Sequence, residues 1–174
     1  NIIMTVSKGV VDCSRNDLNS AKESFCVLDK GQCLAEALID ADVFLGVSKP
    51  EILTTEMIKT MKTNPIIIAM ANPIPEIMPA DALAAGAKIV ATGRSDYPNQ
   101  INNVLVFPGL FRGLLDVGAT TVPPELKPII AEALASVVSD PSPECIIPDP
   151  FNPAVAQTVA GAVKDFYDKN PQKL

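Results

Sequence analysis

The chain has 174 residues, 48% of them hydrophobic, and a net charge of −6. This hydrophobic content is enough for the core of a folded domain. An acidic chain without clusters of Lys and Arg does not fit nucleic-acid binding, which needs such clusters to contact phosphates. Since no apolar run approaches the roughly 20 residues of a membrane span and no basic, apolar leader begins the chain, we expect a cytoplasmic protein with no membrane partner.

The absence of histidine narrows the chemistry that this chain can perform. Ser-His-Asp and Cys-His catalysis are excluded, so proton transfer would need Lys, Tyr, Asp, Glu or Cys. The four cysteines, Cys13, Cys26, Cys33 and Cys145, form no CxxC pair, and a zinc site of ordinary Cys/His type is not expected. We predict that they are scattered, reduced thiols.

Strand and helix patterns alternate along the chain. Strands are predicted at residues 2–6, 42–46, 66–70 and 88–92. Helices are predicted at residues 15–25, 34–39, 55–61, 79–86, 104–115, 124–138 and 154–168. Thr54 is placed to cap the third helix, while Pro79 and Gly86 suit the first turn and the C-terminal cap of the fourth. The unbroken run Ile66, Ile67, Ile68 predicts a strand buried on both faces.

Short connections between alternating strands and helices indicate an α/β fold with a parallel sheet and right-handed crossovers. We predict a Rossmann-like, doubly wound sheet over residues 1–150, followed by a C-terminal helix over residues 151–174. The chain has no initial Met and none of its glycines has the G-x-G-x-x-G spacing of a dinucleotide-binding turn. We therefore expect the first βα unit of this domain to lie upstream of residue 1.

Polar or glycine-containing segments follow all four predicted strands. They begin at Ser7, at Gly46, at Asn72 and at Gly93. In an open parallel sheet, ligands bind at the carboxyl ends of the strands, so we expect these four segments to converge on one site. The fourth segment is unusual because it carries four amides within five residues, namely Asn99, Gln100, Asn102 and Asn103. In the same segment we interpret Asp96 as the partner of Arg94.

Five segments together closely resemble the C-terminal, cofactor-binding domain of the bacterial-type malic enzymes. They are SKGVV (7–11), ADVFLGVS (41–48), AMANPIPEIMP (69–79), TGRSDYPNQINNVLVFPGLFRGLLDVGAT (92–120) and IIPDPFNP (146–153). The resemblance covers essentially the whole chain. It implies oxidation of malate by hydride transfer to NADP or NAD, followed by decarboxylation to pyruvate with Mg or Mn.

The resemblance also implies roles for individual residues. Asn72 and Asn103 would bind the substrate malate, since amides donate to a carboxylate or hydroxyl without adding a charge that competes with the metal. The expected cofactor-binding residues are Ser7, Lys8, Gly46, Val47, Ser48, Asn72 and Asn102. The family's Lys and Tyr acid–base pair and its metal ligands lie upstream, so we expect no catalytic residue and no metal ligand in this chain. A homodimer or homotetramer is expected, as in the family.

One departure from the family pattern favours NADP over NAD. NAD-binding members usually carry an acid at the end of the second strand, and here that position is Val6, followed by Ser7 and Lys8. A carboxylate about 4 Å from a 2′-phosphate would cost on the order of 4 kcal/mol per charge pair at an effective dielectric of about 20. Its absence therefore favours the phosphorylated cofactor.

Two other functions fit the same residues. A related dehydrogenase could act on another small hydroxy or amino acid, and would lack the metal carboxylates in its upstream half. A non-catalytic nucleotide-sensing domain would use the asparagines only to order the loop, and would bind cofactor without turnover.

Overall fold

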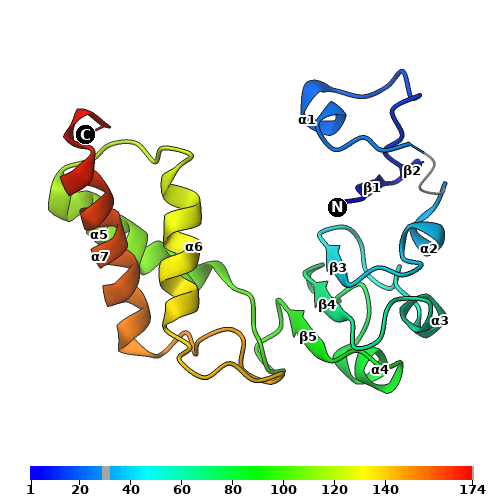
Figure 1. Ribbon diagram of the computed structural model, residues 1–174. Coiled ribbons are helices and arrows are strands. Elements are labelled where there is room, and N and C mark those ends of the chain that lie inside the picture. Colours follow the sequence, from blue (N-terminus) through cyan, green and yellow to red (C-terminus); the bar gives the residue numbers. More distant parts are fainter. Residues whose placement is uncertain (29–31, 174) are drawn as a thin grey trace. The chain divides into compact units, whose positions relative to one another are not determined.

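The computed structural model describes residues 1–28 and 32–173 of the chain. They fold into two units, Asn1–Val90 and Ala91–Leu174, each with its own buried core (Figure 1). In chain order the elements are β1 (Thr5–Val6), β2 (Gly9–Val10), α1 (Ser20–Glu23), α2 (Leu34–Ala37), β3 (Val43–Gly46), α3 (Thr55–Lys59), β4 (Ile66–Ala69), α4 (Pro79–Ala84), β5 (Ile89–Thr92), η1 (Asn103–Leu105), α5 (Phe107–Val117), α6 (Leu126–Ser136), α7 (Pro153–Lys169) and η2 (Pro171–Lys173).

Among the described residues, β3, β4 and β5 form a parallel sheet in this order, with helices beside it. β3 and β4 pair so that Gly46 lies opposite Ala69. The α/β fold class is confirmed. Thr54 caps α3 by accepting from the Met57 backbone N–H at 3.3 Å, and Pro79 stands in the first turn of α4, as predicted.

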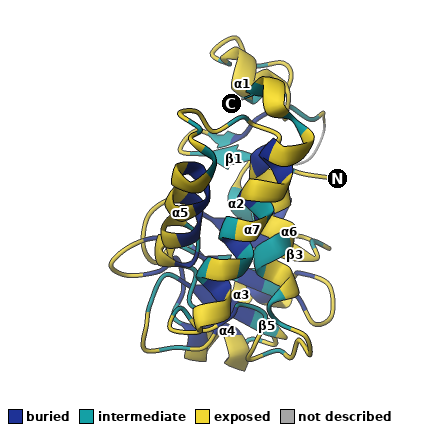
Figure 2. Cartoon of the chain, turned by 90° about the vertical axis from the view of Figure 1, so that its left-hand side faces the viewer, coloured by how far each residue is buried: buried dark blue, intermediate teal, exposed yellow. Residues whose placement is uncertain are grey.

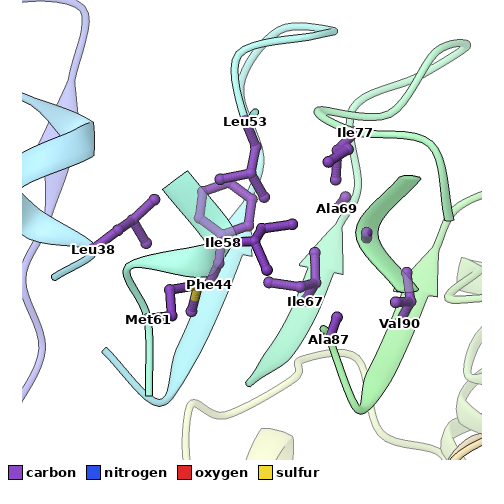
Figure 3. Packing of buried hydrophobic residues seen from close by; sticks show 11 residues of the cluster. Leu38, Phe44, Leu53, Ile58, Met61, Ile67, Ala69, Ile77, Ala87 and Val90 are labelled. Carbon is purple, nitrogen blue, oxygen red and sulfur yellow. The ribbon is translucent and has the colours of Figure 1, made fainter. Parts of the chain in front are cut away.

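One face of this sheet carries the core of the N-terminal unit. Phe44 and Ile67 point from the strands toward Leu53 and Ile58, and all four side chains are buried (Figure 3). On the other face, Leu45 is 60% exposed, and Ile66 and Ile68 are only partly buried. The prediction that residues 66–68 are buried on both faces is therefore wrong for the described residues.

The first predicted strand is much shorter than expected and does not join the parallel sheet. β1 pairs with β2 in a separate antiparallel hairpin, with Val6 opposite Gly9. Gly9 has a φ of 98°, which glycine adopts without strain. The chain therefore reverses directly after Val6, and the expectation that four strand ends share one edge is wrong for this strand.

The segment after the hairpin is mostly turns rather than the helix predicted at residues 15–25. Only Ser20–Glu23 is helical, with Asn19 as its N-cap. Cys13 and Cys26 form a disulfide that closes this segment, so the prediction of reduced thiols is wrong for these two cysteines. Cys33 and Cys145 are free and exposed.

The C-terminal unit is helical, and α7 packs against both α5 and α6. Buried and exposed residues alternate along α5, as expected for a helix with one face in a core (Figure 2). Gly109 and Gly113 on α5 allow very close approach to α7, because a Cβ on either would lie within 2.6 Å of a Val159 or Val163 Cβ. Over the described part of the chain, no helix has both the length and the hydrophobicity to cross a membrane.

Candidate functional site

The segment after β3, which we call the β3 turn, consists of Gly46, Val47 and Ser48. Gly46 is buried, whereas Val47 and Ser48 are exposed. The Gly46 carbonyl accepts from the Met70 backbone N–H at 3.0 Å, which continues the parallel ladder past the end of β4. A Cβ on Gly46 would lie 2.5 Å from the Glu76 carboxyl carbon. The absence of a side chain at residue 46 therefore makes room for Glu76.

The segment after β4, which we call the β4 turn, consists of Ala71, Asn72 and Pro73. Asn72 is exposed and the Asn72–Pro73 peptide bond is cis. Because Gly46 and Ala69 are paired in neighbouring parallel strands, the β3 and β4 turns leave the sheet at the same edge. The structure thus brings together four of the predicted site residues, Gly46, Val47, Ser48 and Asn72.

Glu76 connects these two turns, although it was not among the residues predicted for the site. One carboxylate oxygen accepts from the Ser48 backbone N–H at 2.9 Å, and the other accepts from the Ala71 backbone N–H at 2.9 Å. The Glu76 side chain is fully buried. The one available signal was an acidic residue inside the otherwise apolar run PIPEIMP, since a buried carboxylate needs partners.

Ser7 and Lys8 form the turn of the β1–β2 hairpin and are exposed. The Lys8 ammonium donates to Asp17 at 2.7 Å. Arg15 donates to both carboxylate oxygens of Asp17 and to the Val10 carbonyl. The hydrogen bonds from Arg15 first, and then from Lys8, hold the pKa of the Asp17 carboxyl well below its usual value. The positive charge predicted at this turn is therefore partly offset by a neighbouring carboxylate.

Asn102 and Asn103 lie in the C-terminal unit, at the start of η1, and both are exposed. The Asn102 side chain accepts from the Val104 backbone N–H at 3.0 Å, so it caps this short helix. The capping bond orients the segment from which the Asn103 side chain emerges. These two candidates belong to a different unit from the β3 and β4 turns.

A third amide of the same loop has a structural role. Asn99 is buried with a φ of 57°. Its amide donates to the Pro143 carbonyl and accepts from the Ile146 backbone N–H, both at 2.8 Å. It therefore joins the amide-rich loop to the loop that precedes α7. The predicted Arg94–Asp96 pair is confirmed, with hydrogen bonds of 2.8 and 2.7 Å that lower the pKa of Asp96.

Comparison with known proteins identifies the family of this fold. Residues 1–165 match the family model described as malic enzyme, NAD binding domain. The chain is 51% identical over 169 residues to the bifunctional malic/malolactic enzyme of Bacillus subtilis, covering 93% of this chain and 41% of that protein. It is 43% identical over 182 residues to an NADP-dependent malic enzyme of Haemophilus influenzae, covering 94% of this chain and 24% of that protein.

Solved structures show the same similarity. The crystal structure of an NAD-dependent malic enzyme from Thermotoga maritima matches with a TM-score of 0.81 and 41% identity, covering 90% of this chain and 42% of that one. The chain thus spans less than half the length of each of these relatives. By its sequence and its fold, the chain belongs to the malic enzyme NAD-binding domain family.

Proposed function

We propose that this chain is the cofactor-binding part of an enzyme that oxidatively decarboxylates malate to pyruvate and CO2, with NADP preferred over NAD as hydride acceptor. The observation that carries the proposal is the pairing of the β3 and β4 turns. Two loops from neighbouring parallel strands, one exposing Val47 and Ser48 and the other exposing the amide of Asn72, lie side by side where this fold class binds its ligands.

A nicotinamide cofactor fits the chemistry of this edge. The β3 turn exposes Val47 and Ser48, so it offers both an apolar side chain and a hydroxyl group. We assign Gly46, Val47, Ser48, Asn72 and Asn102 to cofactor binding, with Ser7 and Lys8 near the adenosine ribose. When bound, the nicotinamide supplies the acceptor for the hydride that leaves C2 of malate.

We assign Asn72 and Asn103 to malate. Each amide can donate one hydrogen bond to a carboxylate or hydroxyl and accept another, and neither carries a charge that would bind the metal. Such uncharged donors can hold and orient C2 of the substrate without adding a net charge beside the metal.

A metal ion, Mg or Mn, would be held by residues outside this chain. Within residues 1–28 and 32–173, no three His, Cys, Asp or Glu side chains are grouped so as to hold a metal ion. The acid and base groups of the reaction would also lie outside this chain, so the isolated chain would bind cofactor without oxidising malate. The complete enzyme would be a cytoplasmic homodimer or homotetramer.

The preference for NADP rests on charge at the β1–β2 hairpin. Val6 provides no carboxylate against a 2′-phosphate, and two cations, Lys8 and Arg15, lie close to the turn. Asp17 opposes this preference because it is bonded to both of them. The known relatives include NADP-dependent and NAD-dependent enzymes, so the test compares the two cofactors.

The test uses the full-length polypeptide that carries this chain. We expect malate-dependent reduction of NADP+ in the presence of Mg2+ or Mn2+, loss of the reaction with EDTA, and a higher kcat/KM with NADP+ than with NAD+. Cofactor binding without turnover would instead identify a nucleotide-sensing domain. Turnover of another hydroxy or amino acid in place of malate would identify a related dehydrogenase.

A further inference from the structure

The Glu76 carboxylate is bonded on both sides to backbone that belongs to the candidate site. Its two oxygens accept from Ser48 in the β3 turn and from Ala71 in the β4 turn, each at 2.9 Å. The side chain is fully buried. A carboxylate in such surroundings is stable only if its oxygens are hydrogen-bonded, so both turns are held against it.

The backbone around Glu76 strengthens this connection. The Glu76 carbonyl accepts from the Leu53 N–H at 3.1 Å, and the Pro75 carbonyl accepts from the Glu51 N–H at 3.2 Å. These bonds fix residues 75–76 against the segment that follows the β3 turn. Because Glu76 is bonded to both turns, a shift of the β4 turn that carried Glu76 along would also move the β3 turn.

We propose that Glu76 is a positioning residue that couples the β3 turn to the β4 turn, so that cofactor and malate bind cooperatively. The inference rests on the proposed function, in which the β3 turn contacts cofactor and Asn72 of the β4 turn contacts malate. A ligand that orders one turn also fixes the Glu76 carboxylate. The fixed carboxylate in turn orders the other turn through its second hydrogen bond. The second ligand then meets a site that is already ordered, which is positive coupling between the two.

The geometry of Gly46 supports a dedicated role for this carboxylate. A Cβ at residue 46 would lie 2.5 Å from the Glu76 carboxyl carbon and 2.5 Å from one of its oxygens. A side chain at residue 46 would therefore displace the carboxylate from the backbone N–H groups that it accepts from. The position of the Glu76 carboxylate at the ends of the two paired strands therefore depends on glycine at residue 46.

The test compares Glu76→Gln with wild type in the full-length polypeptide. Glutamine has nearly the same shape but only one acceptor oxygen, so it can satisfy Ser48 or Ala71 but not both. We expect the KM values for NADP+ and for malate to rise together, each by about tenfold, the factor that corresponds to one lost hydrogen bond. Wild-type KM values in the variant would overturn the proposal.

A second readout separates positioning from a loss of stability. In wild type, malate is expected to tighten the binding of the reduced cofactor, measured as the Kd of NADPH from its fluorescence with and without malate. This pair cannot react, so the ratio of the two Kd values reports coupling alone. We expect the ratio to fall toward one in Glu76→Gln.

The matched control is Ile58→Val, which removes one methylene from a buried side chain on α3, a helix that belongs to neither turn. It is expected to lower Tm but to keep the KM values and the Kd ratio of wild type. A Kd ratio lowered equally in both variants would overturn the proposal. A wild-type protein that fails to reduce NADP+ or NAD+ with malate would refute the proposed function instead.

A measurement on wild type decides the matter if Glu76→Gln does not fold. The Ser48 and Ala71 backbone N–H groups should exchange slowly with deuterium, because Glu76 protects both. Fast exchange at either position, in a protein whose core amides remain protected, would show that the carboxylate does not hold that turn and would overturn the proposal.

Discussion

Gly113 of α5 lies against Val163 of α7 so closely that a Cβ on Gly113 would be 2.6 Å from the Val163 Cβ and 2.9 Å from the Ala160 carbonyl oxygen. Real Cβ atoms do not make such contacts, so the distance between the two helices depends on glycine at this position. Gly109 makes the same kind of approach one turn earlier, to Val159 and the Ala156 carbonyl. Together these glycines set the packing of the C-terminal unit.

Gly113→Ala is therefore expected to destabilise the protein, by about 1–3 kcal/mol, because the added methyl group must push α5 and α7 apart. Gly161→Ala is the matched control, since Gly161 lies on α7 with nothing within 4 Å of the added Cβ. That change should stabilise the helix by up to about 1 kcal/mol. Urea unfolding of both variants measures the difference, and equal effects would contradict the close packing described here.

Asn99 gives a second prediction, because its side chain joins two loops through paired bonds to Pro143 and Ile146. Asn99→Ala should lower the free energy of unfolding by about 1–3 kcal/mol, since two partly buried backbone groups lose their partner. Asn99→Gly separates the causes, because glycine accepts the φ of 57° but makes no side-chain bonds. If glycine restores wild-type Tm, backbone conformation rather than the amide is what stabilises the loop.

The comparison of these residues with the sequence shows which features could be predicted. Strands β3, β4 and β5 and helices α3, α5 and α7 were predicted close to their positions, because hydrophobic periodicity and caps such as Thr54 act within a few residues. The hairpin of β1 and β2 was missed, because pairing between strands depends on which partner is present. Local pattern alone predicted one longer strand there.

The same limit explains the candidate site. Asn72 could be selected because it directly follows a strand, and the structure places it beside the β3 turn. The roles of Glu76 and Asn99 could not be predicted, because they depend on partners 28 and 44 to 47 residues away in sequence. The disulfide between Cys13 and Cys26 has the same limit, because it forms only when the intervening segment folds back.

The Asp17 carboxylate should make the stability of the hairpin region depend on pH. Its bonds to Arg15 and Lys8 lower its pKa in the folded state. A lowered pKa contributes stability that is fully present above the unfolded pKa of about 4 and is lost as pH falls through the folded value. Asp17→Asn should therefore lower Tm at pH 7, and its difference from wild type should shrink below pH 4. A difference that stays constant with pH would contradict the ion pair.

Val6 provides a test of cofactor preference. Val6→Asp would place a carboxylate at the end of β1, two residues before Lys8, where we propose that the adenosine ribose binds. Repulsion of the 2′-phosphate should lower the NADP+/NAD+ ratio of kcat/KM at least about tenfold, since a charge pair about 4 Å apart at an effective dielectric of about 20 costs on the order of 4 kcal/mol, more than the roughly 1.4 kcal/mol of a tenfold change. Val6→Asn, which has the same shape without the charge, is the control. Equal ratios in the two variants would argue that the ribose lies elsewhere.

Asn103→Ala in the full-length polypeptide tests the assignment of malate to this loop. The side chain is exposed at the start of η1, so its removal leaves the fold largely intact. Loss of a hydrogen bond to a charged substrate is expected to lower kcat/KM for malate by about ten- to a hundredfold, with little change in NADP+ affinity. Asn102→Ala is the comparison, because that residue caps η1 through Val104 and should affect Tm and cofactor binding as well. If Asn103→Ala weakened malate and NADP+ to the same extent, the residue would be a support of the loop rather than a contact to the substrate.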